Sequence, residues 1–165
     1  MAMDTTEAPQ IIEHIIKNLD YTPYETRWLP LSPRLVVLGV SPSNRGVIAV
    51  HGMSGGAAPE LCRFDHKHGV RSGTFGASRL EDRELAFGDF GGRLSICDLE
   101  RGPVAGDDGA LYSVQAHDGV VNAVDGFGGS TVSCGAPELA TAGRDGCVRI
   151  WDPRCDAAVA SLEPA

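Results

Sequence analysis

Apolar and polar residues alternate along the chain between residues 139 and 152. There, Val148 and Ile150 alternate with Cys147, Arg149 and Trp151, which is the period of a strand with one face in a core. Asp145-Gly146 precedes this strand, and the dipeptide predicts a type I′ turn, because both central residues of that turn adopt positive φ. The pattern therefore predicts a β-hairpin that is closed by Trp151-Asp152.

The same pattern recurs twice upstream, which indicates a repeat architecture. Residues 84–98 align with the hairpin without a gap, and residues 34–51 form a third strand–turn–strand unit. The glycines that open the third strand of each unit, Gly46, Gly92 and Gly146, are about 46 and about 54 residues apart. This spacing is near the ~40–45 residues of a WD-repeat unit once loop insertions are allowed.

Each unit also needs an innermost and an outermost strand, and both can be placed. We expect inner strands over 24–29, 71–75 and 120–125, and outer strands over 60–64, 110–114 and 157–162. Residues 126–135 are rich in glycine and serine and are expected to form a loop. The sequence thus predicts an all-β chain, a WD40-type β-propeller with four-stranded blades over 21–66, 67–115 and 116–165.

The number of blades sets an expectation about the whole protein. Closed propellers have about 4–8 blades, whereas these 165 residues hold three. An open arc would expose one sheet edge and the apolar flank meant for the next blade. We therefore expect the chain to be the N-terminal part of a longer propeller.

The N-terminal segment, residues 9–19, allows two interpretations. Apolar residues at 11, 12, 15, 16 and 19 have the spacing of a helix. A chain that begins a propeller, however, often supplies the outer strand of its last blade, which would make 11–16 a closing strand within residues 1–20. We take the strand as our prediction, with the helix as the alternative.

Composition narrows the class of protein. The 21 glycines and 10 prolines suit many tight turns, and no apolar run approaches the ~20 residues of a membrane span. The N-terminus lacks a signal-peptide pattern, and the five cysteines contain no CxxC pair, as expected for reduced thiols. The formal net charge of −8 disfavours a phosphate backbone as ligand. We therefore expect a cytoplasmic protein that binds neither nucleic acid nor membrane.

Several stretches resemble a particular family in its own order. They are Pro9-Gln-Ile-Ile-Glu-His-Ile, residues 62–77, Gly88-Asp-Phe-Gly-Gly, Asn122-Ala-Val-Asp-Gly, Gly135-Ala-Pro-Glu and residues 144–154. On these residues the chain resembles the WD-repeat dynein axonemal assembly factors. The resemblance implies a seven-bladed propeller and a cytosolic adaptor that works with the RuvB-like ATPase co-chaperone complex and a prefoldin-like complex. It also implies a role in preassembling dynein chains and a link to apoptosis.

In WD-repeat proteins a buried network joins a His, a hydroxyl residue, an Asp in the tight turn and the Trp. Here those positions are His117, Thr141, Asp145 and Trp151, and their hydrogen-bonding groups are complementary. The His and Asp alone could suggest a catalytic dyad, but no nucleophile is placed beside them. We interpret the network as structural and expect neither enzymatic activity nor a cofactor.

The second blade departs from this pattern. Phe87, Gly91 and Cys97 occupy the hydroxyl, Asp and Trp positions. We therefore expect the network to be absent there and packing alone to hold that blade.

We also interpret a cluster of potential metal ligands and one tryptophan as structural rather than functional. Cys62, Asp65, His66 and His68 are close in sequence, but their spacing matches no common zinc pattern, so a solvated strand end and loop is expected rather than a metal site. Trp28 lies on the first inner strand and is expected in the core, because large apolar residues are usually buried.

The remaining hypotheses concern binding. Loops on a rigid scaffold commonly carry recognition, so Asp89, Phe90 and Gly91 in one turn and Phe127 in another loop are weak candidates for protein contacts. The first hypothesis is a non-catalytic co-chaperone adaptor. The second is a propeller that reads a modified peptide, such as a methylated histone tail, which requires an aromatic cage. The chain has few aromatic residues, which favours the adaptor.

Overall fold

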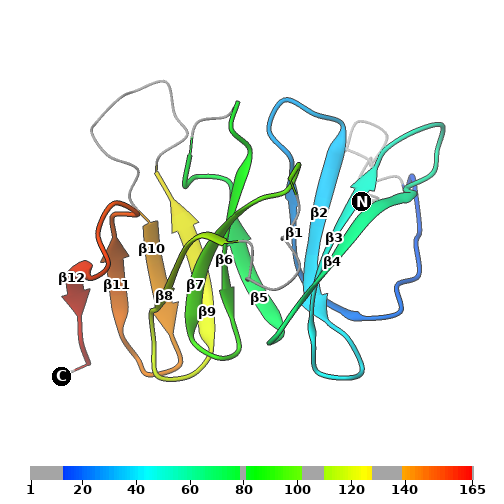
Figure 1. The fold of residues 1–165 in the computed structure, drawn as a ribbon. Helices are drawn as coiled ribbons and strands as arrows, with labels where there is room; N and C mark the ends of the chain where they lie inside the picture. The colour runs from blue at the N-terminus through cyan, green and yellow to red at the C-terminus, as the bar shows by residue number, and fades with distance from the viewer. Residues whose placement is uncertain (1–12, 79–80, 102–109, 128–138, 165) are drawn as a thin grey trace, which may run out of the picture.

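Three four-stranded antiparallel sheets stand next to one another in the computed structural model (Figure 1). The structure describes residues 13–78, 81–101, 110–127 and 139–164. The first sheet contains β1 (Thr22–Trp28), β2 (Arg34–Val40), β3 (Gly46–Gly52) and β4 (Glu60–His66). The second contains β5 (Val70–Thr74), β6 (Glu84–Asp89), β7 (Arg93–Asp98) and β8 (Ala110–Gln115). The third contains β9 (Val121–Gly126), β10 (Leu139–Gly143), β11 (Val148–Trp151) and β12 (Ala158–Leu162).

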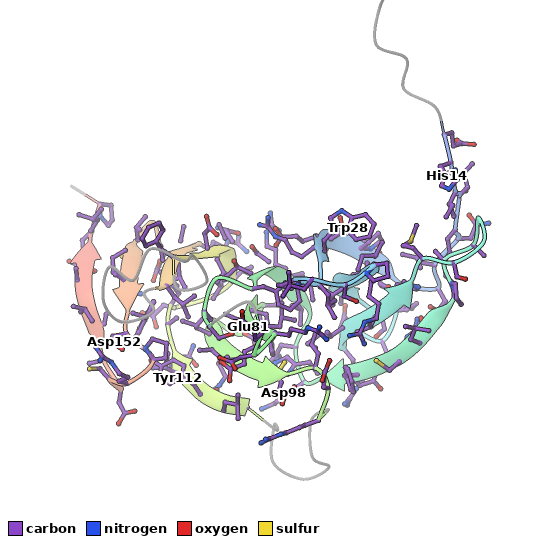
Figure 2. All side chains as sticks on the ribbon, turned by 90° about the horizontal axis from the view of Figure 1, so that it is seen from above. His14, Trp28, Glu81, Asp98, Tyr112 and Asp152 are labelled. Carbon is purple, nitrogen blue, oxygen red and sulfur yellow. The ribbon has the colours of Figure 1, made fainter. Side chains whose placement is uncertain are left out.

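The sheets have the organisation of propeller blades. Each follows chain order from an inner to an outer strand, and the inner strands β1, β5 and β9 lie next to one another. Seen from above, the sheets form an arc (Figure 2). The predicted fold class is confirmed, and the strand bounds differ from those expected by at most two residues. Within the described residues, no helix is long and apolar enough to cross a membrane.

The core lies between the sheets rather than within any one of them. Leu85 and Phe87 of β6 pack against the first sheet in a cluster that includes Leu38. Ala86, between them, belongs to a second cluster with Val121 and other residues of the third sheet. Because successive side chains of a strand point to opposite faces, one strand supplies both interfaces.

One glycine permits the close approach of the second and third sheets. A Cβ atom at Gly88 would lie 2.4 Å from Cγ1 of Val121, which is far inside van der Waals contact. Gly88 sits on the same face as Leu94, its cross-strand partner, so the valine of β9 fills the space that a side chain at 88 would need. The interface therefore requires glycine at this position.

The turn between β10 and β11 differs from the predicted type I′ turn. Gly146 has φ of 81°, but Asp145 is not among the residues with positive φ. The N–H of Gly146 donates to the carbonyl of Gly143 at 3.2 Å, and the N–H of Gly143 donates to the carbonyl of Cys147 at 3.0 Å. This is a three-residue hairpin loop over residues 144–146, whose last residue is left-handed and therefore favours glycine.

The same loop geometry corrects the repeat alignment of the first blade. Gly92 has φ of 87° in the β6–β7 turn, and Asn44 has φ of 61° in the β2–β3 turn. The N–H of Asn44 donates to the carbonyl of Ser41 at 2.9 Å, as Gly146 does to Gly143. Asn44 is therefore the equivalent of Gly92, and the predicted equivalence of Gly46 is wrong. Asparagine tolerates the left-handed conformation better than most residues.

The N-terminal segment forms no strand or helix in its described part, and the blade that its predicted strand would close lies outside the described residues, so the strand stays a prediction. Residues 11 and 12 lie outside the described residues, and residues 13–20 form neither strand nor helix. His14 lies away from the sheets in Figure 2, whereas Leu19 packs beside Tyr21 against the first sheet. A strand needs a neighbouring strand for its hydrogen bonds, and no described strand pairs with this segment.

Trp28 is exposed, contrary to the expectation that it belongs to the core. Its side chain is 62% exposed, and its cross-strand partner is Leu35. Leu35 packs on the face of the first sheet opposite to Val36, and Val36 faces the second sheet. Cross-strand partners share a face, so Trp28 lies on a flank that no described sheet covers.

No described sheet covers the far flank of the third sheet either. Phe127, Val159 and Leu162 are each at least 60% exposed. A hollow of about 230 Å³ lies on this sheet, lined by Asp125, Gly126, Phe127, Leu139, Ala140 and Ile150. Apolar flanks and an open strand edge are sites of self-association.

We predict that residues 1–165 expressed alone self-associate. The reason is that the exposed side chains of β12 and the hollow behind it have no neighbouring sheet. Size-exclusion chromatography with light scattering, together with calorimetry, measures this directly. A monomer that melts cooperatively would contradict the prediction.

Candidate interaction site

The structure brings together the four residues predicted to form a network in the third blade. His117 Nδ1 lies 2.9 Å from Asp145 Oδ1, and its Nε2 lies 2.8 Å from Thr141 Oγ1. Trp151 Nε1 donates to the same Thr141 oxygen at 2.8 Å. If Nδ1 carries the ring proton and donates it to Asp145, Nε2 accepts the threonine hydroxyl proton, and the groups of these four side chains are complementary.

A fifth side chain joins this network. The Arg149 guanidinium lies 3.0 Å from Asp145 Oδ2. Burial raises the pKa of the Asp145 carboxyl, but hydrogen bonds from the Cys147 N–H, the His117 ring, the Asp118 N–H and Arg149 outweigh that effect and hold the pKa well below its usual range. The carboxylate is therefore ionised at neutral pH and acts as the common acceptor of the turn.

The second blade contains a displaced version of the same pair, which sequence reasoning missed. His66 Nε2 lies 3.0 Å from Asp89 Oδ2, and the Asp89 side chain is fully buried. Val70 pairs with Asp89 as Val121 pairs with Gly143, so His66 occupies the position of His117. The four-residue network is absent here, since Phe87 and Cys97 replace the hydroxyl residue and the Trp, but the His–Asp pair shows that packing alone does not hold this blade.

The pair in the second blade differs from that in the third because its aspartate stands at a different position of the turn. Asp89 lies two residues before Gly91, the position equivalent to Asp145, and it meets the histidine through Nε2 instead of Nδ1. Phe87, at the hydroxyl position, contacts the His66 ring edge-on with the ring centres 5.1 Å apart. Burial raises the pKa of Asp89, but the hydrogen bonds from His66 and the Arg93 N–H keep it below its usual value.

All three turns have one backbone requirement in common. The N–H of the first residue after the left-handed position needs an acceptor, and each blade supplies a side-chain oxygen. Asp145 Oδ1 accepts from Cys147 at 3.1 Å, and Asp89 Oδ1 accepts from Arg93 at 2.9 Å. In the first blade Ser41 Oγ accepts from the Arg45 N–H at 3.1 Å. An Asp or Ser at the start of a hairpin loop is a sequence signal for this role.

The predicted protein-binding residues are not equally available. Asp89 is buried in its pair with His66, so its proposed role in binding is replaced by a structural one. Phe90 is half-buried and contacts Tyr24 edge-on at 5.4 Å between ring centres. Gly91 is half-buried beside it, whereas Phe127 is 64% exposed on the open flank. Residues 128–135 of the other candidate loop lie outside the described residues.

The histidine and cysteine cluster near the end of β4 separates into different environments. His66 is buried, which corrects the expected solvated strand end, while Asp65 is exposed. No group of three or more potential metal ligands gathers among the residues that the structure describes. Cys62, Cys97, Cys147 and Cys155 are free thiols, and burial raises the pKa of Cys97 to about 12.

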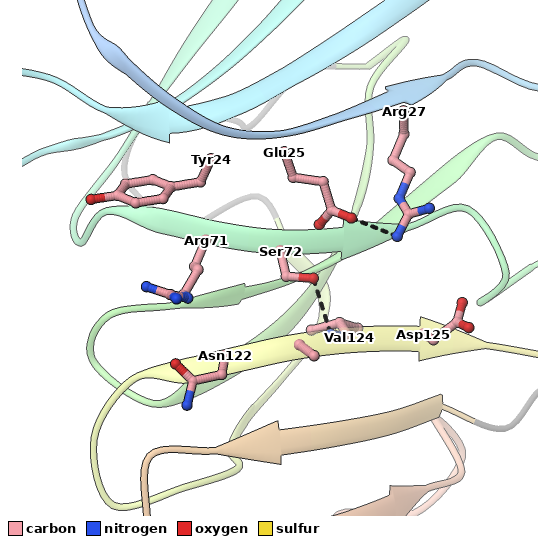
Figure 3. A pocket seen from close by; sticks show the side chains of 9 residues that line it. Tyr24, Glu25, Arg27, Arg71, Ser72, Asn122, Val124 and Asp125 are labelled. Carbon is pink, nitrogen blue, oxygen red and sulfur yellow. Dashed lines mark hydrogen bonds and ion pairs between the residues drawn. The ribbon is translucent and has the colours of Figure 1, made fainter.

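A pocket of about 440 Å³ lies where the three inner strands meet (Figure 3). Glu25 accepts the Gly73 N–H at 2.6 Å, and Arg27 donates to the Gly73 carbonyl at 2.9 Å. Ser72 accepts the Val124 N–H at 3.1 Å. These bonds join β1 to β5 and β5 to β9, so the pocket has a fixed wall.

The two ends of the pocket differ in character. Tyr24, Arg71 and Asn122 lie together at one end, and Arg27 and Asp125 at the other (Figure 3). The Arg71 guanidinium lies over the Tyr24 ring, 5.7 Å from its centre. Tyr24 is the one aromatic residue among those that line this pocket, and a protein cation already covers its face.

No protein-family model matches the sequence. The chain is 46% identical over 164 residues to dynein axonemal assembly factor 10 of Chlamydomonas reinhardtii, an alignment that covers 99% of this chain and 44% of the relative. It is 41% identical over 163 residues to the Homo sapiens protein of that name, with 98% and 44% covered. The chain is a partial homologue of dynein axonemal assembly factor 10. It spans less than half of the length of these curated relatives.

Solved structures place the homologue in the WD40 fold. The RRP9 WD40 repeats have a TM-score of 0.65 at 15% identity, over 90% of this chain and 40% of theirs. Chaetomium thermophilum Sqt1 bound to the N-terminus of the ribosomal protein L10 has a TM-score of 0.59 at 19% identity, over 84% of this chain and 33% of that one. These likenesses concern the fold alone.

We predict that Asp145→Ala destabilises the full-length protein by about 1–3 kcal/mol at neutral pH, because the buried His117 ring and the Cys147 N–H lose their acceptor. The folded pKa of Asp145 lies below the unfolded value of about 4. Its contribution is therefore complete above pH ~4 and lost as the pH falls toward the folded pKa. Denaturant titrations of both proteins at several pH values measure the difference.

Asp118→Ala is the matched control for this substitution. Asp118 is exposed and contributes only its backbone N–H to the network, so the same charge is removed without loss of an acceptor. Equal stability of the Asp145→Ala and Asp118→Ala proteins would show that the network contributes nothing.

We predict that Asp89→Ala costs about 2–4 kcal/mol of unfolding free energy in the full-length protein, because it leaves His66 and the Arg93 N–H without an acceptor in a buried site. Asp98→Ala provides a comparison at the other end of the same blade, where the carboxylate bonds to exposed N–H groups. Urea unfolding measures both. A loss no larger for Asp89 than for Asp98 would contradict the proposed role of the pair.

Proposed function

We propose that the chain is part of a non-catalytic WD-repeat scaffold that supports the cytoplasmic assembly of axonemal dyneins. The observation that carries the proposal is its 46% identity, over nearly its whole length, to a protein named as a dynein axonemal assembly factor. The chain spans 44% of that relative, so the statement that it shares the role of the whole relative is itself a proposal. The WD40 fold suits such a role, because its blades form a rigid platform with exposed loops.

The proposed partners are those that the family resemblance implies. They are the RuvB-like ATPase co-chaperone complex, a prefoldin-like complex and the dynein chains. We propose that the protein holds such partners together rather than acting on them chemically. In support, both ring nitrogens of His117 and the Asp145 carboxylate are engaged inside the blade. The His66–Asp89 pair is buried in the same way.

The alternative, a reader of methylated peptides, receives little support from the inner pocket. A methylated lysine is bound by several aromatic rings around its cationic head. The pocket lining contributes Tyr24, whose ring face is covered by Arg71. Affinity purification of the full-length protein with mass spectrometry separates the two functions: RuvB-like ATPases support the scaffold, and histones support the reader.

We predict that deleting the gene in a ciliated organism depletes axonemal dynein arms while affecting cilium length less. The reason is that an assembly scaffold acts on dynein before it reaches the cilium. Electron microscopy of axonemes and motility measurements test this outcome. Normal arms with normal motility would refute the assembly role and leave the fold unaffected.

A chimeric protein tests whether this chain itself has the function of its relative. In a Chlamydomonas reinhardtii strain without its dynein axonemal assembly factor 10, residues 1–165 replace the matching part of that relative. We expect the chimera to restore dynein arms. A chimera that is expressed and folded but restores none would show that this chain lacks the function of its relative.

A further inference from the structure

Unpaired positive charge gathers at one end of the first two blades, although the chain has a formal net charge of −8. Arg45 lies in the β2–β3 turn, Lys67 between β4 and β5, and Arg71 near the start of β5. All three side chains are exposed, and none of them takes part in an ion pair within the described residues. Arg27, Arg34, Arg63 and Arg83 in the same two blades each have a carboxylate partner.

The three cations belong to one continuous surface, because the segments that carry them touch. A Cβ at Gly46, beside Arg45, would lie 2.2 Å from the carbonyl oxygen of His68. The N–H of Phe90 donates to the carbonyl of Gly69 at 2.8 Å. The β2–β3 turn, residues 66–71 and the β6–β7 turn therefore form a single rim, which we call the basic rim.

The acidic groups nearby leave this charge largely uncompensated. Asp89 is buried under the rim and engaged by His66 and the Arg93 N–H. Asp65 is exposed, but its cross-strand partner Val47 packs on the face of the first sheet that points away from the second. Asp118 is exposed beside His117, whose backbone N–H donates to the carbonyl of Gly92 in the β6–β7 turn at 3.0 Å, so this single carboxylate borders the rim on the side of the third blade.

The rim also borders an aromatic contact and the inner pocket. Arg71 lies over Tyr24, which is 44% exposed and packs edge-on against Phe90. Tyr24 and Arg71 both line the 440 Å³ pocket, on the same side of it (Figure 3). A chain that crosses the rim would therefore meet cations first and then a ring at the mouth of a pocket.

We propose that the basic rim, Arg45, Lys67 and Arg71 with Tyr24 at its inner margin, binds an acidic segment of a partner protein. This inference rests on the proposed scaffold function and specifies the chemistry of one partner. Carboxylates of the segment pair with the three cations, and an apolar side chain beside them packs on Tyr24. Protein is the favoured class of ligand, because an acidic segment carries fewer negative charges along its length than a nucleic-acid backbone, so the net charge of −8 on the chain repels it less.

The test measures binding of a short fluorescein-labelled peptide of repeated Glu-Leu-Ser units to the full-length protein by fluorescence anisotropy. We expect binding that weakens as salt increases and that falls about tenfold in the variant Lys67→Gln/Arg71→Gln. Arg101→Gln is the control, because Arg101 is an exposed cation at the opposite end of the second blade. Its affinity for the peptide should equal that of the parent.

A second variant distinguishes loss of binding charge from loss of folding. Arg45→Gln/Lys67→Gln removes two of the same charges without touching Tyr24, and thermal melting checks that each variant is folded. A folded variant that binds like the parent would overturn the site. Equal binding of a Lys-Leu-Ser peptide, or tighter binding of oligothymidylate, would overturn the acidic-protein assignment. Normal dynein arms after gene deletion would refute the scaffold function and leave the peptide result unchanged, so the two failures are distinguishable.

Discussion

The structure depends on the burial of both faces of the middle sheet. A β-strand alternates its side chains between two faces, and β6 uses this to place Leu85 and Phe87 against the first sheet and Ala86 against the third. The middle sheet therefore needs the first sheet on one face and the third sheet on the other to bury its apolar side chains. The same rule explains the outer blades, whose second faces carry the exposed Trp28 on one side and Phe127 on the other. Stability in such a repeat comes largely from interfaces between neighbours.

In each of the three hairpin turns, a backbone N–H needs a side-chain acceptor, and the blades supply it from different residues. The tight loop leaves a backbone N–H that needs an acceptor, and Ser41, Asp89 and Asp145 each provide it. Asp89 is the last residue of its strand, whereas Asp145 lies inside its loop. The paired histidine therefore contacts Asp89 through Nε2 and Asp145 through Nδ1. The backbone requirement is therefore constant across the blades, while the residue that meets it varies.

Sequence reasoning found the strands because their period is local and repeats. It also located His117, Thr141, Asp145 and Trp151, which the structure brings within hydrogen-bonding distance. It missed the His66–Asp89 pair, because the aspartate stands two positions from the expected one and only strand register shows the equivalence. Trp28 was misplaced because its burial depends on which sheet covers the first blade, and that information lies outside the strand that carries it.

The distribution of charge follows from the same packing. The two aspartates nearest the turns are drawn inward by histidines and backbone N–H groups, where they satisfy donors that would otherwise be buried without partners. The burial of Asp89 removes one carboxylate from this surface, and Arg45, Lys67 and Arg71 have no ion-pair partner among the described residues, although acidic residues outnumber basic ones in the chain by 22 to 14. Net charge therefore describes how this protein acts on a ligand at long range, whereas the local placement of carboxylates, with Asp89 buried below the turns, determines which charges this end of the blades presents at contact.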